Sequence, residues 1–393
     1  FRIKITQSLG VIQYVNLPDT QYFLLVYPIC LILIGAVFIA AHLWFKAPKY
    51  LLWMGLSCIL PSVALGSQTL MTNAQLRLTA PWFALFYLGG AWAVVHGMLL
   101  KANSKSNIFV AVTLIVVGMA LLLYFTHFDE KLWLRIVIIN IVILCLEALA
   151  LPKVYELFKK TYALEKLLCF SYVLLFTYGV IRTLIVIVYL QNVQYVNLVT
   201  TEWWMMMVSV NLLLSLWFAI IVSAVAVKER FDIINEERLR DSLTKLYNRN
   251  GFLEKTKDLF NELQHGQVYL VMCDIDNFKD INDTWGHVVG DKILCEIADL
   301  LKSNIRQGDI AGRFGGEEFI ILLQSADEES SFALLERLRK TIEDHFFINH
   351  IRVTASFGAA RIDADSQLMS ALEIADKRLY NAKNNGRNRV CFN

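Results

Sequence analysis

The stretch AGRFGGEEFIIL, residues 311–322, places two glycines and two adjacent carboxylates between two apolar runs. The runs IAGRF and FIILL predict two strands of a hairpin with Gly315 and Gly316 at its turn. Glycine lets the chain turn there and keeps side chains away, so that a large flat ligand can approach the backbone. Glu317 and Glu318 are either solvated or placed beside a cation, and the hairpin alone leaves both possibilities open.

Further carboxylates follow a predicted strand upstream. The run VYLVMC, residues 268–273, is short and apolar and predicts a buried strand, which ends in Asp274, Ile275 and Asp276. If this strand lies beside the hairpin, Asp274 and Glu317 converge. Converging carboxylates repel unless a cation lies between them, and a few hard oxygen ligands suit Mg²⁺ that holds the phosphates of a substrate.

The pattern from about residue 241 onward alternates between helix and strand. Helices are predicted through HVVGDKILCEIADLLKSNI, at about 328–345 and at about 367–384, with strands at RVTASFG and VCF. Roughly 150 residues suffice for one core, so this half predicts an α/β sandwich.

Four motifs occur in this half in a fixed order. They are DSLTKLYNR (241–249), DIDNFKDINDTWGHVVGDKIL (274–294), GGEEF (315–319) and ADKRLYNAKNNGRNRV (375–390). Together they resemble the GGDEF family of diguanylate cyclases over residues 238–393. The resemblance implies a nucleotide-cyclase-like central sheet flanked by helices, and the condensation of two GTP into cyclic di-GMP with release of two pyrophosphates.

The same resemblance implies a metal site for Mg²⁺ or Mn²⁺. Asp274, Glu317 and the carbonyl of Ile275 correspond to metal ligands. Glu318 corresponds to the position associated with a second metal and with activation of the attacking 3′-hydroxyl.

Substrate contacts follow from the resemblance as well. Residues Asn277, Phe278 and Lys279 correspond to the loop whose backbone amides receive the terminal phosphates, beside Gly315 and Gly316. Lys383 and Arg387 correspond to the phosphate clamp, although their charges taken alone would be read as solvated. Asn282 and Asp291 correspond to the pair that reads guanine, whose donors suit Asp and whose acceptor suits Asn.

The segment RQGD contains Arg306 and Asp309 a few residues before the glycines. An isolated RxxD is usually a surface ion pair worth less than about 1 kcal/mol. In this register it resembles the inhibitory site of the family, where Arg and Asp bind the product away from the catalytic cleft.

Residues 1–227 have a different composition. The chain is 56% hydrophobic with a mean hydropathy of +0.48, and most of its charges lie after this region. Seven segments are long and apolar enough to cross a bilayer: 21–44, 50–71, 81–100, 107–126, 132–152, 165–190 and 202–227. The sequence therefore predicts an all-α seven-helix membrane domain in contact with lipid. The net charge of +2 gives no support for a nucleic-acid partner.

The loops predict the orientation of these spans. Lysines gather in the first, third and fifth loops, whereas Arg77 and Lys131 are the basic residues of the second and fourth. The lysine-rich side is cytoplasmic by the positive-inside rule. We therefore expect the N-terminus outside and residues 241–393 in the cytosol, at the inner membrane of a bacterium.

Polar residues inside spans are candidates for function. We expect His96 and Glu147 to form a polar contact that senses a ligand or protons, unless backbone or headgroups satisfy both. Arg182 is the alternative partner for Glu147, but counting residues from the cytoplasmic ends separates the two by about 18 Å in depth.

Residues 228–240 predict a short amphipathic helix that leaves the membrane. Phe231, Ile234, Leu239 and Leu243 form an apolar edge among charges. Because such an edge needs a partner, we expect the same helix of a second chain, and hence a homodimer.

Two rival functions are weighed against the cyclase. A receptor that only binds cyclic di-GMP through Arg306 has no need of Asp274 and Glu317. A transporter with a regulatory nucleotide domain is disfavoured, because the spans contain few charges and no matching pair of Gly/Pro-broken helices.

Overall fold

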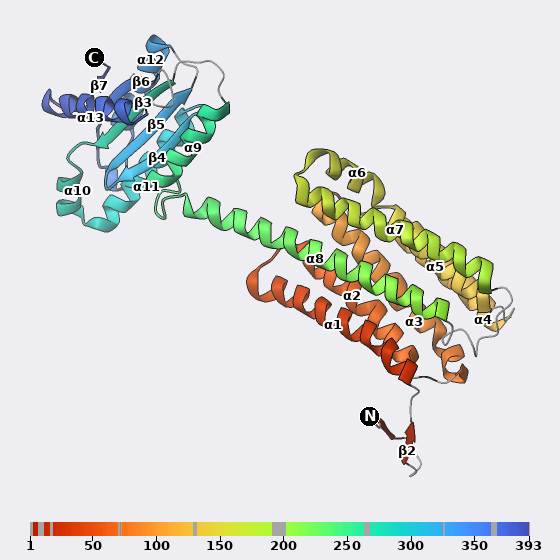
Figure 1. Cartoon of the computed structure of the whole chain (residues 1–393). Helices are drawn as coiled ribbons and strands as arrows, with labels where there is room; N and C mark the ends of the chain where they lie inside the picture. The colour runs from red at the N-terminus through yellow and green to blue at the C-terminus, as the bar shows by residue number, and fades with distance from the viewer. Residues whose placement is uncertain are drawn as a thin grey trace. The chain divides into compact units, whose positions relative to one another are not determined.

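The computed structural model describes residues 3–6, 12–15, 19–69, 71, 73–128, 132–190, 202–262, 268–324, 327–362 and 368–392. The chain divides into two compact units, Phe1–Arg230 and Phe231–Asn393 (Figure 1). Each unit is described by itself below. The side chains of Arg77 and Lys131 lie outside the described residues.

Unit 1 is a helical bundle preceded by a two-stranded antiparallel ladder of β1 (Ile3–Thr6) and β2 (Ile12–Val15). Its helices are α1 (Asp19–Phe45), α2 (Lys49–Thr69), α3 (Asn73–Lys101), α4 (Ile108–His127), α5 (Leu132–Ala148), α6 (Leu151–Lys160), α7 (Ala163–Leu190) and the part of α8 (Glu202–Arg238) that precedes Phe231. Among the described residues, seven helical segments are long and apolar enough to cross a membrane, as the sequence predicted.

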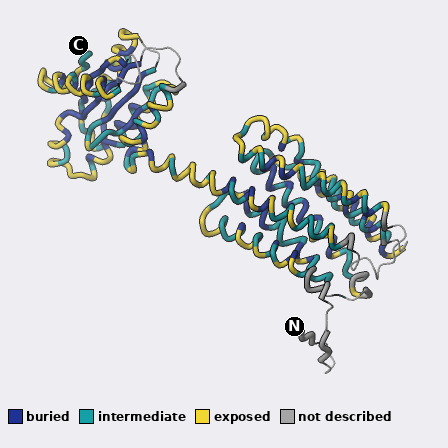
Figure 2. Tube along the Cα trace, viewed as in Figure 1, coloured by how far each residue is buried: buried dark blue, intermediate teal, exposed yellow. Residues whose placement is uncertain are grey.

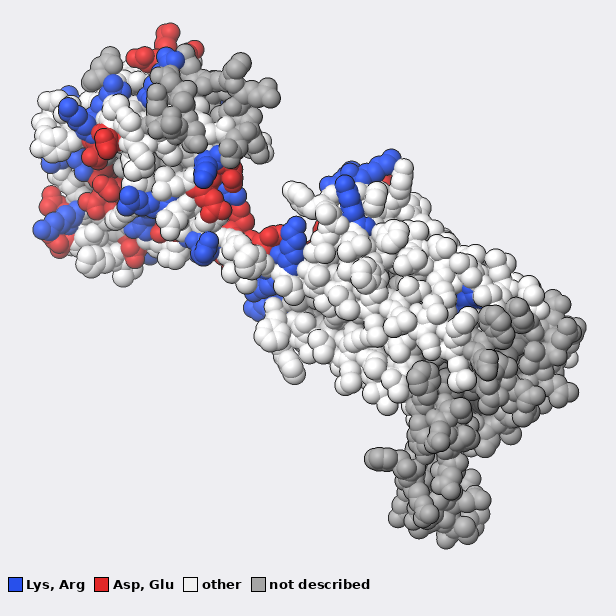
Figure 3. Space-filling view, viewed as in Figure 1, with Lys and Arg blue, Asp and Glu red and all other residues white. Residues whose placement is uncertain are grey.

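Close backbone packing joins the first two of these helices. A Cβ built on Gly35 would lie 2.6 Å from the carbonyl oxygen of Gly55, and one built on Gly55 would lie 2.7 Å from that of Gly35. Small residues permit such a close approach between apolar helices. The visible surface of unit 1 is largely uncharged, whereas both signs of charge cover unit 2 (Figure 3).

Two boundaries in unit 1 differ from the sequence-based expectation. The fifth apolar segment runs from Trp133 to Lys160, because α6 follows α5 after a short turn. The helix expected at 228–240 is the end of α8 and stops at Arg238. Leu239 is buried, and Leu243 packs against the core of unit 2, so neither belongs to the apolar edge expected on this part of α8.

Unit 2 is built on a five-stranded sheet with the order β4-β5-β3-β6-β7. The strands are β3 (Val268–Ile275), β4 (Ile310–Gly315), β5 (Glu318–Gln324), β6 (Ala355–Ile362) and β7 (Val390–Cys391). The helices are α9 (Arg249–Glu262), α10 (Phe278–Trp285), α11 (His287–Asn304), α12 (Glu328–Asp344) and α13 (Leu368–Asn384), with a 3₁₀ turn at Ile348–His350. All neighbours pair antiparallel except β6 and β7.

The alternation of side chains along β3 builds two cores. Tyr269, Val271 and Cys273 pack with α11 and α12, while the intervening residues pack with α9 and α13. Every residue of β3 is consequently buried, which explains its continuous apolar run (Figure 2). The predicted α/β sandwich, the strand at 268–273 and the hairpin are confirmed.

Candidate active site

The edge of the sheet where β3 ends carries the predicted carboxylates. β3 pairs antiparallel with β5, and Asp274 is directly opposite Glu318. The N–H of Ile275 donates to the carbonyl of Glu317 at 3.4 Å. The pairing therefore brings Asp274, Glu317 and Glu318 to one place, as expected from the sequence.

The hairpin turn does not use glycine in the expected way. Gly315 pairs with Glu318, so that Gly316 and Glu317 form the turn between β4 and β5. Neither Gly315 nor Gly316 lies in the left-handed region. A Cβ on Gly316 would meet no atom within 4 Å. The glycine leaves open space beside the carboxylates, which agrees with the role of admitting a ligand.

The electrostatics of Asp274 are unusual. Burial raises the pKa of its carboxyl to about 6; the Lys383 ammonium opposes this shift, and Glu317 and Glu318 add to it. The Nζ of Lys383 lies 2.7 Å from Oδ1 of Asp274. The predicted phosphate-binding lysine on α13 is thus held by the carboxylate of Asp274.

The two residues predicted to read guanine come from consecutive helices. α10 begins after Asn277, whose backbone is left-handed with φ 53°, and Phe278 is buried at its first position. Asn282 lies on α10 and packs against Gly290 of α11, where an added Cβ would collide with its Oδ1. Asp291 follows Gly290 directly, so the fold places both residues at the junction of α10 and α11.

Arg313 is a residue of the site that sequence reasoning missed. Its Nε and Nη2 donate to the carbonyl of Gly316 at 3.0 and 2.7 Å, and its Nη1 lies 3.1 Å from Oδ1 of Asp241. That carboxylate also accepts from the N–H of Thr244 at 2.8 Å. Arg313 therefore links the turn at Gly316 to Asp241 of the first motif. The sequence feature that could have identified Arg313 is its position two residues before Gly315.

Arg306 and Asp309 line a cavity of about 280 Å³ together with Arg337 of α12. The Asp309 carboxylate accepts from the backbone N–H groups of Arg306 and Gln324, each at 2.9 Å. Within the described part of the chain, no ion pair joins the Arg306 guanidinium to the Asp309 carboxylate. Arg337, which lies far away in the sequence, adds a second guanidinium.

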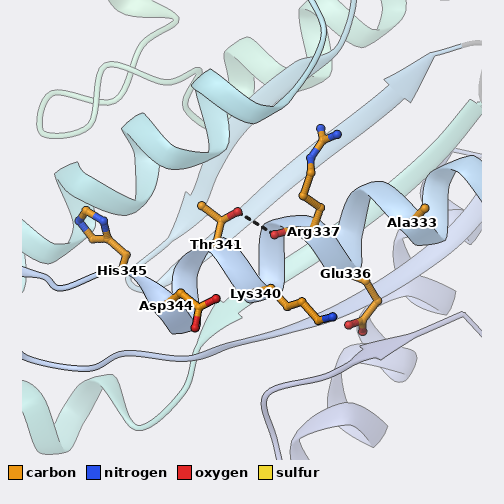
Figure 4. A pocket seen from close by; sticks show the side chains of 7 residues that line it. All are labelled: Ala333, Glu336, Arg337, Lys340, Thr341, Asp344 and His345. Atoms are coloured by element: carbon orange, nitrogen blue, oxygen red, sulfur yellow. Dashed lines mark hydrogen bonds between the residues drawn. The ribbon is translucent and has the colours of Figure 1, made fainter.

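A neighbouring cavity of about 620 Å³ lies along α12 and shares Ala333 and Arg337 with the first. Its lining side chains all come from α12 and His345, and they point in different directions (Figure 4). None of the predicted catalytic residues lines it.

The polar residues of unit 1 have other neighbours than expected. The Nδ1 of His96 lies 3.0 Å from Oγ of Ser106, and its ring meets Trp53 edge-on. Oε2 of Glu147 lies 3.9 Å from the position of a Cβ on Gly179 of α7, one turn before Arg182. The structure does not pair His96 with Glu147 as predicted.

As expected from the sequence, Arg182 is not the partner of Glu147. Its Nη2 donates to Oδ1 of Asn140, two turns before Glu147 on α5, at 2.6 Å. The hydroxyl of Tyr172, ten residues before Arg182 on α7, donates to the backbone carbonyl of Glu147 at 2.8 Å. These contacts place Glu147 and Arg182 at different depths, although the difference is about 10 Å, at roughly 1.5 Å per residue, and not the expected value of about 18 Å.

Comparison with known proteins agrees with the arrangement in unit 2. Residues 238–389 match the family described as "Diguanylate cyclase, GGDEF domain". The uncharacterised protein YhcK of Bacillus subtilis is 42% identical over 160 residues, which cover 39% of this chain and 45% of that protein. Diguanylate cyclase A of Treponema denticola is 45% identical over 125 residues, covering 31% of this chain and 34% of that protein.

A solved structure also aligns with part of the chain. The coiled coil and GGDEF domain of DgcB from Caulobacter crescentus, in complex with c-di-GMP, is 27% identical with a TM-score of 0.41, and the match covers 43% of this chain and 93% of that one. This chain spans less than half the length of the two curated relatives. Residues 238–389 are therefore a GGDEF domain similar to that of diguanylate cyclases.

Proposed function

We propose that this chain is a membrane-anchored diguanylate cyclase that converts two GTP into cyclic di-GMP and two pyrophosphates. The observation that carries the proposal is the convergence of Asp274, Glu317 and Glu318 at one sheet edge, beside the open space at Gly316. Such a cluster is costly without a cation, since Asp274 is almost fully buried.

The donor set fits a hard divalent cation, which we propose to be Mg²⁺ or Mn²⁺. Asp274, Glu317 and the carbonyl of Ile275 would hold it, with Glu318 available for a second ion. No group of three His, Cys, Asp or Glu that could hold a metal occurs among the described residues. Mg²⁺ does not need one, because it usually takes one or two carboxylates together with substrate phosphates and water. When bound, the cation supplies charge neutralisation at the phosphates.

The residues of unit 2 divide the remaining work. Asn282 and Asp291 would hold guanine, while the backbone amides of Asn277, Phe278 and Lys279 receive the terminal phosphates. Lys383 and Arg387 would clamp those phosphates, and Lys383 would leave Asp274 once a cation neutralises it. Most of the catalysis is then positioning and charge stabilisation.

The reaction requires two domains to face each other. The 3′-hydroxyl of each GTP attacks the α-phosphate of the other, its proton passes toward Glu318, and pyrophosphate leaves as the new P–O bond forms. Two such steps close the ring. Each domain holds one GTP, so neither half-site is complete without a second copy.

Helix α8 offers a surface for that second copy. Its apolar residues recur at alternating steps of four and three: Leu213, Trp217, Ile220, Ala224, Val227, Phe231 and Ile234. This spacing is the heptad pattern of a coiled coil. Lipid can cover the first part, but Phe231 and Ile234 follow the charged run that starts at Lys228 and are 61% and 48% exposed. We propose that α8 pairs there with α8 of a second chain.

Charges on this helix segment test the pairing. We expect Phe231→Glu with Ile234→Glu to lower cyclic di-GMP formation per chain by about tenfold at low protein density in proteoliposomes, because two half-sites then meet less often. Raising the protein-to-lipid ratio should restore much of the rate. Ile233→Glu is the matched control, since Ile233 is 46% exposed but lies off the heptad stripe. An equal loss in the control would contradict pairing through this stripe.

A charge cluster supports signalling from unit 1 through α8. Lys101 of α3, whose side chain is 6% exposed, contacts the carboxylates of Glu165 on α7 and Glu229 on α8. The hydroxyl of Tyr50 on α2 donates to Glu229 at 2.8 Å. Glu229 thus joins α8 directly to α2 and α3 just before unit 1 ends, and Lys101 links α7 to the same cluster. A signal that rearranges these contacts would change how the paired α8 helices orient the two catalytic domains toward each other.

Product inhibition is the second part of the proposal. Arg306, Asp309 and Arg337 line one cavity and would bind cyclic di-GMP, whose phosphates suit guanidinium groups. We expect Arg306→Ala to keep the initial rate and to raise the product level at which the progress curve flattens by about tenfold. Progress curves with added cyclic di-GMP measure this. If Arg306→Ala left that product level unchanged, inhibition by product through this cavity would be contradicted.

The direct test of the whole proposal is product formation by the full chain in nanodiscs supplied with GTP and Mg²⁺, with nucleotides separated by chromatography. Cyclic di-GMP should form together with two equivalents of pyrophosphate. A folded protein that binds cyclic di-GMP tightly but never makes it would instead be a receptor.

A further inference from the structure

The segment that follows α13 has an unusual backbone. Gly386, Arg387 and Asn388 have φ angles of 108°, 58° and 47°, so three successive residues lie in the left-handed region. Glycine adopts this region freely and asparagine more readily than most residues, whereas a residue such as arginine is strained there by roughly 1 kcal/mol or more. Such strain persists only where the surroundings hold the backbone in place, and it concentrates at functional sites.

The first anchor of this segment is Asp276, the residue that follows β3. The backbone N–H of Asn388 donates to Oδ2 of Asp276 at 3.0 Å. The same carboxylate, which is 6% exposed, accepts from the hydroxyls of Thr354 and Ser356, each at 2.7 Å. Asp276 is therefore committed to hydrogen bonds within the domain, although it lies only two residues after Asp274.

The second anchor comes from α12. The Nδ2 of Asn388 donates to Oε1 of Glu343, and its Oδ1 accepts from Nη1 of Arg339, both at 2.8 Å. Arg339 also contacts Glu343 and Glu336 at 2.8 and 3.0 Å. The amide of Asn388 thus completes a charged network with one donor and one acceptor, a combination that neither Asp nor Gly can supply.

We propose that Asn388 is a positioning residue for Arg387. This inference rests on the proposed function, in which Arg387 clamps the phosphates of GTP. The two anchors fix the peptide on the C-terminal side of Arg387, while the N–H of Arg387 donates to the carbonyl of Ala382 at 3.1 Å on the other side. Held at both ends, Arg387 is presented in a left-handed conformation that it would not keep by itself.

The alternative is that asparagine occurs here only because it tolerates a positive φ better than most residues. The two explanations differ in what glycine would do. Asn388→Gly removes the strain but also both side-chain hydrogen bonds. If asparagine serves only to tolerate the positive φ, the Asn388→Gly variant should bind substrate normally. If Asn388 positions Arg387, the variant should bind substrate more weakly.

The experiment is a double-mutant cycle on binding of a non-hydrolysable GTP analogue with Mg²⁺ to the full chain in nanodiscs. We expect Asn388→Ala, Asn388→Gly and Arg387→Ala each to weaken binding by about tenfold, as for the loss of one charge-assisted hydrogen bond. The pair Arg387→Ala with Asn388→Ala should bind no more weakly than Arg387→Ala alone, because Asn388 acts through Arg387.

A matched control separates positioning from general damage. Asn349 also has a positive φ, 58°, but it is exposed in the turn Ile348–His350. Asn349→Ala should bind the analogue like the parent. The inference would be overturned if the double variant lost affinity for the analogue by the product of the two single losses, or if Asn388→Gly bound the analogue normally. A parent that binds the analogue but makes no cyclic di-GMP from GTP would overturn only the proposed function, since the binding cycle still decides the role of Asn388.

Discussion

Replacing Glu317 by Ala is expected to abolish cyclic di-GMP formation, with a loss of at least about a thousandfold. A thousandfold corresponds to about 4 kcal/mol of transition-state stabilisation, a plausible share for a ligand of the cation that neutralises the transferring phosphate. The domain should still fold, because Glu317 lies in the turn between β4 and β5 and is only partly buried. The measurement is chromatographic detection of product from GTP and Mg²⁺ by the full chain in nanodiscs.

The control for this variant is Glu373→Ala. Glu373 is an exposed carboxylate of α13, so its loss changes the net charge of the domain equally without touching the sheet edge. Normal product formation by the control and none by Glu317→Ala would locate the chemistry at the carboxylate cluster. If Glu317→Ala retained more than a tenth of the parent rate, the proposed cation site would be wrong.

Replacing Gly358 by Ala is expected to produce the largest loss of stability in unit 2. A Cβ at Gly358 of β6 would collide with backbone atoms of Ala375 and Leu379 on α13. Backbone cannot rotate away as a side chain can, so α13 must shift off the sheet. We expect the free energy of unfolding to fall by about 3 kcal/mol, which lowers the melting temperature by about 10 °C.

Calorimetry of the full chain measures this effect, with the transition of unit 2 identified by its upward shift in the presence of GTP. Gly316→Ala is the matched control, because an added Cβ there meets no atom within 4 Å. It should leave the melting temperature unchanged while it weakens GTP binding, since the methyl group enters the open space beside the carboxylates. Equal melting temperatures for Gly358→Ala and the parent would contradict the packing of α13 described here.

Local patterns predicted much of the fold. The strand β3 and the hairpin between β4 and β5 were recognised because their buried positions are occupied by short runs of apolar residues. The seven apolar segments were recognised for the same reason. The limits of the fifth span were missed, because α6 is amphipathic and reads as a loop when only apolar length is counted.

The motif residues were predicted from resemblance, but their partners were not. Lys383 and Asp274 are far apart in the sequence, and only the packing of α13 against β3 and β6 brings them to 2.7 Å. The ion pair between Arg313 and Asp241 likewise joins two residues that are far apart in the sequence. Charges carry no periodic signal for such long-range pairs, so these contacts could not be read from local patterns.

The sequence by itself determined that an apolar helical half precedes an α/β half, and that carboxylates follow one strand and occupy the turn of a hairpin, because hydropathy and strand alternation are local properties. The tertiary structure alone decided which groups satisfy one another. It placed Asp276 and α12 on either side of Asn388, and it gave Glu147 and His96 different neighbours. Those outcomes depend on how whole elements pack, since hydrogen bonds between distant residues form only where packing has already brought their atoms within about 3 Å.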